Sequence, residues 1–292
     1  MCRWLAYYGD PIPIETLVLQ RDHSLIDQSL HSRDSGADPT NGDGFGVGWY
    51  SELGGIPGMY KSIMPAWNDR NLRELAKHIS APLFFAHIRA STGTPVQETN
   101  AHPFRHGRWL FMHNGYVREF SKVRRDLLLA VDPELFPEIE GSGDTEVLFH
   151  LALTFGLEQD PLTALERMAG FVEEVGHRHG VEYPLKMTVA TSDGERIIAA
   201  RYSSDGQPGS LYFSTAIRAL KERHPDILEL QVLSDETRAI VSEPLGGVVG
   251  AWNAVPASTI GIVQPGQDEL YQFTPRRPAD ARPKERVSLR PS

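Results

Sequence analysis

The sequence predicts a layered α+β domain, and three observations lead to that class. Strand-like segments open the chain, helical segments dominate its middle, and strands return after residue 184. This order favours separate layers of helix and sheet over a strictly alternating α/β sheet. The 292 residues contain no internal repeat and no linker-like stretch that would divide them. We therefore expect one domain over residues 2–274, a length that a single domain can reach.

The first third of the chain is expected to hold a strand, a short helix and a glycine-rich loop. Residues 2–8 form a short apolar run typical of a buried strand, and residues 12–20 fit a turn with a short helix. Residues 33–48 are rich in Gly, Asp, Ser and Asn and end in the motif NGDGFGVG. So many glycines indicate a backbone that needs positive φ angles or a close approach to another group.

The middle of the chain combines helices with two buried strands. Apolar residues three or four apart predict a helix over residues 70–79, and continuous apolar runs predict buried strands over 82–90 and 109–112. Helical patterns follow at 119–130 and 145–157. A third helix should begin at Asp160-Pro161, with the aspartate at the N-cap and the proline at the first helical position.

Beyond residue 184 the pattern returns to strands. Residues 185–191 and 196–202 are predicted strands joined through Asp193-Gly194, the strongest short hairpin signal. Further strands are expected at 211–215, 230–234, 238–242 and 258–263. Residues 275–292 contain four prolines, six cations and two acids with no apolar period, so we expect a disordered, locally basic tail.

The overall charge and the apolar runs exclude several functional classes. With 29 Lys plus Arg against 38 Asp plus Glu, the net charge is −9. This balance argues against a nucleic-acid partner, which would require a basic face. No apolar run approaches the roughly 20 residues of a membrane helix, and the N-terminus lacks the pattern of a signal peptide. We expect a soluble cytoplasmic protein with no membrane partner.

The sequence offers no convincing metal or cofactor site. Its one cysteine excludes an intramolecular disulfide, a zinc ribbon and an iron–sulfur centre. His102 and His106 have the spacing of a metal-binding pair on a helix, but Pro103 between them disfavours a helix there. We therefore expect no metal and no cofactor.

The position of the single cysteine is its most informative property. Cys2 follows the initiator Met1, and removal of Met1 would place the thiol beside its own free α-amine. That amine has an ordinary pKa of about 7.7–8.0 and could accept the thiol proton. One residue would then supply both a nucleophile and its base. The alternative is that Cys2 is a small buried apolar residue on an edge strand.

Three further stretches place polar groups just after buried strands or at a helix start. Arg89 follows a buried strand and could bind a carboxylate with its guanidinium fork, although a structural ion pair is the simpler interpretation. Asn114-Gly115 follows the next strand and could form an oxyanion hole, or an ordinary turn. Asp144 opens an apolar helix, where it could be an N-cap or could bind an ammonium group.

In this order, the stretches resemble a known family. Cys at position 2, HIRASTG at 87–93, NAHP at 100–103, HNG at 113–115 and DTEV at 144–147 are similar to the glutaminase domain of class II glutamine amidotransferases. These are N-terminal nucleophile hydrolases, and the match runs from Cys2 to about residue 155. The resemblance implies a four-layer αββα sandwich with two antiparallel sheets inside.

The resemblance also assigns expected roles to the matching positions. Cys2 would be the nucleophile, and Asn114 and Gly115 would form the oxyanion hole. The substrate-binding residues would be Arg89 for the glutamine α-carboxylate, Asp144 for its α-ammonium group, and Thr92 in the pocket wall. His102 would support the site, and Arg33 matches an arginine of the family's early glycine loop. Gly93 departs from the pattern, since some members carry a histidine after the threonine.

The implied activity is cleavage of the side-chain amide of glutamine, or of a γ-glutamyl amide, through a thioester on Cys2. The chain resembles the stand-alone members, since the length after Glu146 leaves no room for a fused synthase. Two options follow for the product: ammonia passed to a separate synthetase, or simple hydrolysis of a γ-glutamyl compound, as in the amidohydrolases of ergothioneine synthesis and glutathione breakdown. A catalytically silent binding module on the same fold is a third interpretation. A homodimer is compatible with each.

Overall fold

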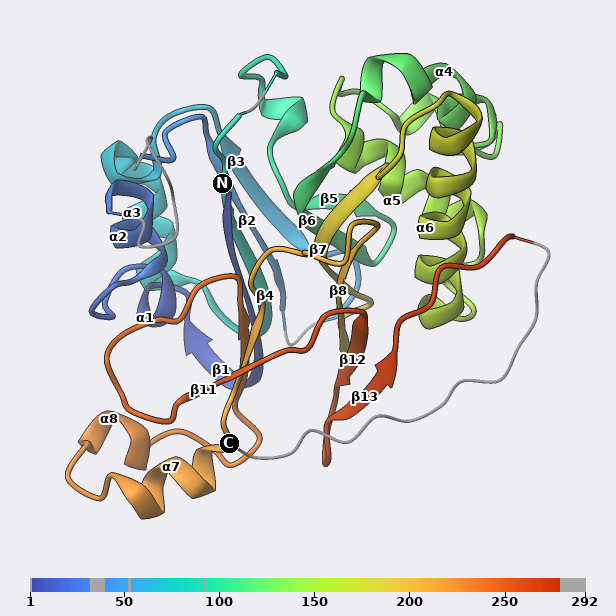
Figure 1. The fold of residues 1–292 in the computed structure, drawn as a ribbon. Helices are drawn as coiled ribbons and strands as arrows, with labels where there is room; N and C mark the ends of the chain where they lie inside the picture. Colours follow the sequence, from blue (N-terminus) through green and yellow to red (C-terminus); the bar gives the residue numbers. More distant parts are fainter. Residues whose placement is uncertain (1, 32–39, 52–53, 92, 279–292) are drawn as a thin grey trace.

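The computed structural model describes residues 2–31, 40–51, 54–91 and 93–278. Two sheets face each other, and helices cover the outer face of each (Figure 1). Two of the expected site residues, Arg33 and Thr92, lie outside the described residues, as does the part of the expected tail from residue 279 onward.

The first sheet carries the N-terminal strand at its centre. In the described part of the chain it has seven strands, in the order β11-β9-β10-β1-β4-β2-β3, and every neighbouring pair is antiparallel. Its strands are β1 (Arg3–Pro13), β2 (Phe45–Tyr50), β3 (Gly58–Ser62), β4 (Ser80–Ile88), β9 (Tyr212–Ser214), β10 (Arg238–Val241) and β11 (Trp252–Ala254).

The second sheet is built mainly from the later half of the chain. Within the described residues it has six strands, in the order β13-β12-β8-β7-β6-β5, again with antiparallel neighbours. They are β5 (Phe104–His106), β6 (Trp109–Val117), β7 (Leu185–Ser192), β8 (Ile197–Ser203), β12 (Thr259–Val263) and β13 (Glu269–Gln272). The predicted hairpin at Asp193-Gly194 joins β7 to β8.

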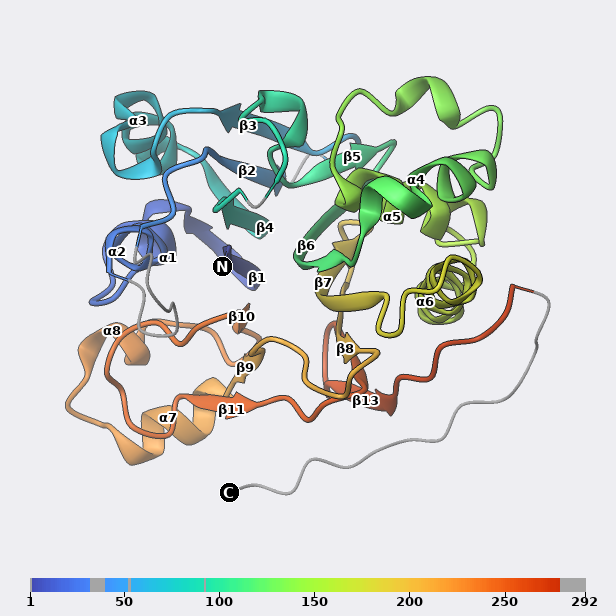
Figure 2. The same ribbon diagram turned by 45° about the horizontal axis from the view of Figure 1, so that its top comes forward.

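Helices form the two outer layers, and a small pair of helices lies at one edge of the first sheet (Figure 2). The first sheet is covered by α1 (Glu15–Val18), α2 (Leu25–Leu30) and α3 (Arg70–His78). The second is covered by α4 (Phe120–Leu129), α5 (Asp144–Thr154) and α6 (Pro161–Arg178). The pair beside β11 is α7 (Ile217–Arg223) and α8 (Leu228–Gln231), and single 3-10 turns occur at η1 (Ala66–Asn68), η2 (Glu98–Asn100) and η3 (Phe136–Glu138).

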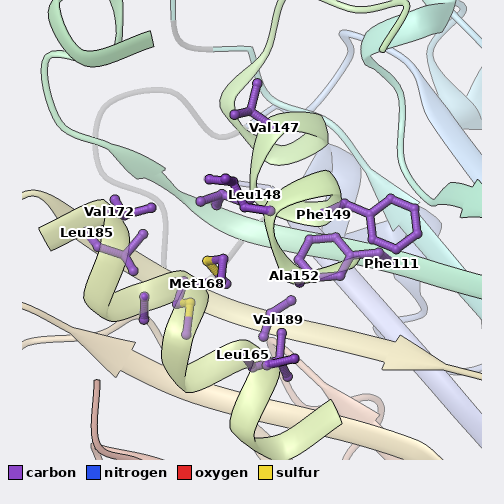
Figure 3. Packing of buried hydrophobic residues seen from close by; sticks show 14 of the residues in the cluster. Phe111, Val147, Leu148, Phe149, Ala152, Leu165, Met168, Val172, Leu185 and Val189 are labelled. Carbon is purple, nitrogen blue, oxygen red and sulfur yellow. The ribbon is translucent and has the colours of Figure 1, made fainter. Parts of the chain in front are cut away.

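The alternation of side chains along the strands explains the layers. In β1, Trp4 and Ala6 pack between the two sheets, whereas Leu5 and Tyr7 pack against the helices of the first sheet. This is the period of two expected for a strand buried on both faces. In β6 of the second sheet, Phe111 points toward the helices that cover this sheet. It stacks on Phe149 of α5, with ring centroids 5.1 Å apart (Figure 3). The expected αββα sandwich is therefore confirmed.

Two element predictions were wrong, and packing explains both. Residues 230–234 are not a strand, because the chain forms α8 and then turns. Leu230 packs in a small apolar cluster with Ile217 and Leu220 of α7. The predicted loop over residues 33–48 contains the start of β2. Gly46 in this strand lets the His102 carbonyl group approach closely, because a Cβ at Gly46 would lie only 2.2 Å from that oxygen.

The beginning of the predicted tail is docked on the body. Glu166 of α6 is fully buried and pairs with Arg276, whose Nε lies 2.8 Å from Glu166 Oε2. The amide N–H of Thr274 donates to the same carboxylate at 3.2 Å. Disorder was therefore the wrong expectation for residues 275–278. In the part of the chain that the structure describes, no helix is long and apolar enough to cross a membrane.

Candidate active site

Strand pairing brings Cys2 beside the residues that follow β4. Arg3 lies opposite Ile88 in the β1–β4 ladder, so the preceding residue reaches the segment at Arg89 and Ala90. The Ala90 N–H donates to the Cys2 sulfur at 3.3 Å, and the sulfur lies 3.4 Å from the Ala90 carbonyl oxygen. Burial raises the pKa of the Cys2 thiol, and the Ala90 N–H only partly offsets this. The thiol therefore requires a nearby base in order to act as a nucleophile.

The carbonyl group of Cys2 is held from two directions. Arg3 Nη1 donates to this oxygen at 3.1 Å, and Asn114 Nδ2 donates to it at 2.7 Å. The Arg3 guanidinium is anchored in turn by Glu243, with Nε 2.6 Å from Oε2 and both side chains about 3% exposed. The second Glu243 oxygen lies 2.5 Å from His23 Nε2. These contacts fix the position of Cys2, and sequence patterns gave no sign of them.

Asn114 and Gly115 lie at the end of β6, opposite Thr188 and Met187 of β7. His87 Nε2 lies 3.1 Å from Asn114 Oδ1. Burial lowers the pKa of His87 to about 3, so its ring is neutral at physiological pH and its Nε2–H donates to the amide oxygen. This contact turns the Asn114 nitrogen toward Cys2. Gly115 has a φ of +140°, and a Cβ there would lie 1.9 Å from the Lys186 carbonyl oxygen.

Arg89 is buried and held by the loop that follows it. Its Nη1 donates to the Pro95 carbonyl oxygen at 3.1 Å, and its Nη2 donates to Thr94 Oγ1 at 2.5 Å and to Ser91 Oγ at 3.3 Å. The Ser91 amide is itself anchored by Asp43 Oδ2 at 2.7 Å. The guanidinium is thus oriented before any ligand binds.

Asp144 is the first residue of α5, and the N-cap is Gly143. The plain N-cap interpretation of Asp144 is therefore wrong. Its Oδ2 accepts a hydrogen bond from the Val117 N–H at 2.7 Å. Within the described residues no cation pairs with this carboxylate, which leaves it available to an ammonium group. Asn100 Oδ1 fixes the preceding loop by accepting from the Ser142 and Gly143 amides at 2.8 and 3.2 Å.

Two further buried histidines support the site. The ring of His102 lies 4.1 Å from that of His87, and its Nδ1 accepts from the His113 amide at 3.5 Å. His113 Nδ1 lies 2.9 Å from Thr145 Oγ1, and its Nε2 lies 3.3 Å from the Lys186 carbonyl oxygen. Burial lowers the pKa of both rings, so they act as neutral hydrogen-bonding groups. His106 is turned elsewhere, with Nδ1 2.7 Å from Glu138 Oε2.

One cavity collects most of the expected site residues. It has a volume of about 580 Å³ and is lined by Cys2, Arg89, His102, Gly115 and Asp144. Asn114 reaches the same place through its contact with Cys2. Across the described residues, no group of three or more His, Cys, Asp or Glu side chains is arranged to hold a metal ion. The arrangement can present a thiol, amide donors, a cation and an anion to one ligand.

Comparisons with known proteins agree with this geometry. The family model for class II glutamine amidotransferases matches residues 19–204, more than half of the chain. The chain belongs to the class II glutamine amidotransferases. Among its amidotransferase relatives, the probable glutamine amidotransferase DUG3 of Saccharomyces cerevisiae is 34% identical over 94% of this chain and 87% of that protein.

A second relative and one solved structure extend the comparison. The γ-glutamyl-hercynylcysteine sulfoxide hydrolase of Mycobacterium tuberculosis is 34% identical over 118 residues, which is 40% of this chain and half of that protein. The structure of a glutamine aminotransferase class-II domain protein from Silicibacter pomeroyi has a TM-score of 0.71 and 32% identity, and covers 94% of this chain and all of that one. This solved structure has the same fold over nearly the whole chain.

Proposed function

We propose that the chain, once Met1 is removed, hydrolyses the side-chain amide of glutamine or a γ-glutamyl amide through Cys2. One observation carries the proposal: Cys2, Gly115, Arg89 and Asp144 line a single cavity. The family match and the name of the mycobacterial relative, a γ-glutamyl hydrolase, support the same reaction class. Residues 2–274 would act as one hydrolase domain.

The first chemical step forms a thioester. The neutral α-amine of Cys2 takes the thiol proton, and the sulfur attacks the amide carbon of the substrate. The carbonyl oxygen becomes an oxyanion, which accepts hydrogen bonds from Asn114 Nδ2 and the Gly115 N–H. Donors held by the backbone of β6 would stabilise the developing charge with little reorganisation. Collapse breaks the C–N bond, and the leaving amine takes the proton from the α-ammonium group.

The second step returns the enzyme to its starting state. Water attacks the thioester carbon and gives a proton to the α-amine. The C–S bond breaks, the thiolate takes that proton back, and glutamate leaves. Arg89 would hold the α-carboxylate and Asp144 the α-ammonium group throughout, so that the scissile carbon stays beside the sulfur. Such positioning accounts for a large part of the rate in reactions of this kind.

Turnover assays test the proposal directly. Protein confirmed to lack Met1 should release glutamate from glutamine or from γ-glutamyl amides, and Cys2→Ala should abolish the release. Comparing kcat/KM for glutamine with that for γ-glutamyl peptides would separate an ammonia-supplying enzyme from a peptide hydrolase. Absence of glutamate release from every one of these substrates would overturn the proposal and favour a silent binding module.

A further inference from the structure

A second arginine lines the catalytic cavity and belongs to α4. Arg124 shares a face of this helix with Phe120 and Ser121, and all three line the cavity. Val123 and Leu127, on the adjoining stripe of the helix, are buried in the core beneath the second sheet, and Phe120 packs against the same core. Because α4 is packed against the core, it holds the Arg124 side chain at the cavity wall.

Arg124 has no counter-ion in the described part of the chain. Its Nε is buried and has no hydrogen-bond acceptor there. The acidic residues nearest to it along the chain have other partners: Glu119 pairs with Lys122, and Asp126 pairs with His179. A buried N–H without an acceptor is costly. A carboxylate bound in the cavity that Arg124 lines would supply the counter-charge that this guanidinium lacks.

The charges of the cavity match a ligand with two carboxylates and one ammonium group. Its described lining has two guanidinium groups, Arg89 and Arg124, and one carboxylate, Asp144. Glutamine has one carboxylate and one ammonium group, which Arg89 and Asp144 would satisfy. A γ-glutamyl amino acid or peptide has a further carboxylate on its leaving amine. The cavity volume of about 580 Å³ lies within the range of roughly 300–1,000 Å³ typical of small-molecule sites, so it is compatible with a ligand of this size.

We propose that Arg124 binds the carboxylate of the leaving amine and selects γ-glutamyl amino acids or peptides with a free C-terminus. The inference rests on the proposed hydrolase function and adds a specificity-determining residue to it. A guanidinium and a carboxylate form paired, charge-assisted hydrogen bonds, which makes Arg124 suited to this recognition.

The test compares two forms of one γ-glutamyl peptide, with a free or an amidated C-terminus. The wild type should hydrolyse the free acid with the higher kcat/KM, mainly through a lower KM. In Arg124→Gln this preference should fall at least tenfold, the size expected for loss of a charged hydrogen bond. Arg124→Lys should keep part of it. Arg125→Gln is the matched control, because Arg125 is exposed on the same helix and does not line the cavity.

Two outcomes would overturn the inference while leaving the hydrolase function intact. One is a wild type that hydrolyses both peptides equally. The other is an Arg124→Gln variant that loses the same factor on both, since Arg124 would then act on the shared glutamyl part or on the shape of the cavity. If the wild type hydrolyses neither peptide and does not hydrolyse glutamine, the proposed function fails and the inference fails with it.

Discussion

Two side chains hold Cys2 by its backbone carbonyl group, and one of them depends on a residue far from Cys2 in the sequence. Arg3 Nη1 and Asn114 Nδ2 both donate to the Cys2 carbonyl oxygen. Arg3 depends on the buried carboxylate of Glu243, which follows β10 in the later part of the chain. The geometry at the thiol is therefore coupled to an ion pair that the reaction itself does not use.

Glu243→Gln tests this coupling. Removing one charge from a buried ion pair is strongly destabilising, because the partner charge stays buried. We expect the free energy of unfolding to fall by roughly 3 kcal/mol in urea titrations, and kcat to fall because the Cys2 carbonyl is less firmly held. Glu195→Gln is the control: it removes an exposed pair with Arg108, whose two side chains are 74% and 52% exposed, and should cost less than about 1 kcal/mol. Equal losses in the two variants would contradict the account.

Asn114→Asp tests the expected oxyanion donor. The substitution keeps the size of the side chain and replaces the donating nitrogen with an oxygen. We expect kcat to fall about 10²- to 10³-fold with little change in KM, as found for the loss of one oxyanion donor. Steady-state kinetics with glutamine and a γ-glutamyl amide measure both constants. A rise in KM with an unchanged kcat would instead indicate a role in ground-state binding.

The sequence indicated some site residues and missed others for a physical reason. Cys2, Arg89 and Asp144 belong to ordered motifs, and each stands next to a predicted element end. Glu243 and Arg3 meet across 240 positions, a contact that no local spacing encodes. The position of His87 could have been predicted from the sequence, because His87 follows Leu83 and Phe85 at a spacing of two. Those two residues pack between the sheets, so the same face of β4 had to carry His87 toward Asn114.

Among the elements, the end of β6 has the tightest steric requirement. Gly115 has φ at +140° and faces the Lys186 carbonyl oxygen of β7 at a distance that excludes a Cβ. Gly115→Ala should therefore move the β6 end away from β7 and lower the free energy of unfolding by about 1–3 kcal/mol, the cost of a strained backbone position. It should also lower kcat. Thermal or urea unfolding and steady-state assays measure both effects.

Gly247→Ala is the matched control for that substitution. Gly247 is exposed and faces open space, with no atom within 4 Å of an added Cβ. We expect the free energy of unfolding of this variant to change by no more than about 0.5 kcal/mol. A Gly115→Ala variant that matches this control in stability and activity would show that the end of β6 is more adaptable than the packing indicates.

The two errors in the prediction of helices and strands come from tertiary packing. Glycines made residues 41–48 look like a loop, yet Gly46 and Gly48 lie in β2, which pairs with β3 and β4. The glycines are needed because His102, Pro103 and Leu110 approach them closely. The apolar run after residue 229 looked like a strand, yet it packs on α7 as a short helix. The periodicity and composition of a segment describe only its own residues. Here the elements packed against each segment determined its secondary structure.

The whole molecule places three neutral histidines between its layers. Burial lowers the pKa of His87 to about 3, and it also lowers the pKa of His102 and His113. The unfolded chain has histidines with pKa values near 6.5. Below that pH the unfolded state binds more protons than the native state, so stability is fully present above about pH 6.5 and is lost as the pH falls.

Urea denaturation at pH 7.0 and 5.5 checks this dependence. His87, whose pKa is lowered to about 3, should contribute a loss of about 1 kcal/mol over that interval. His102 and His113 should add losses of the same sign, since burial lowers the pKa of both. His102→Asn should show a smaller loss between the two pH values than the wild type, whatever its stability at pH 7. His78→Asn, at an exposed position on α3, controls for the substitution itself. A wild type whose stability rises on acidification would contradict the assignment of neutral, buried rings.

The central claim for the whole molecule is that Cys2 becomes a nucleophile when it is the N-terminal residue. Because Cys2 is the single cysteine of the chain, intact-mass and peptide mass spectrometry can locate a covalent label without ambiguity. Protein lacking Met1 should take up one equivalent of a glutamine-mimicking diazoketone on Cys2, and protein retaining Met1 should not. An unlabelled Cys2 in protein lacking Met1, or equal labelling of both forms, would contradict the claim.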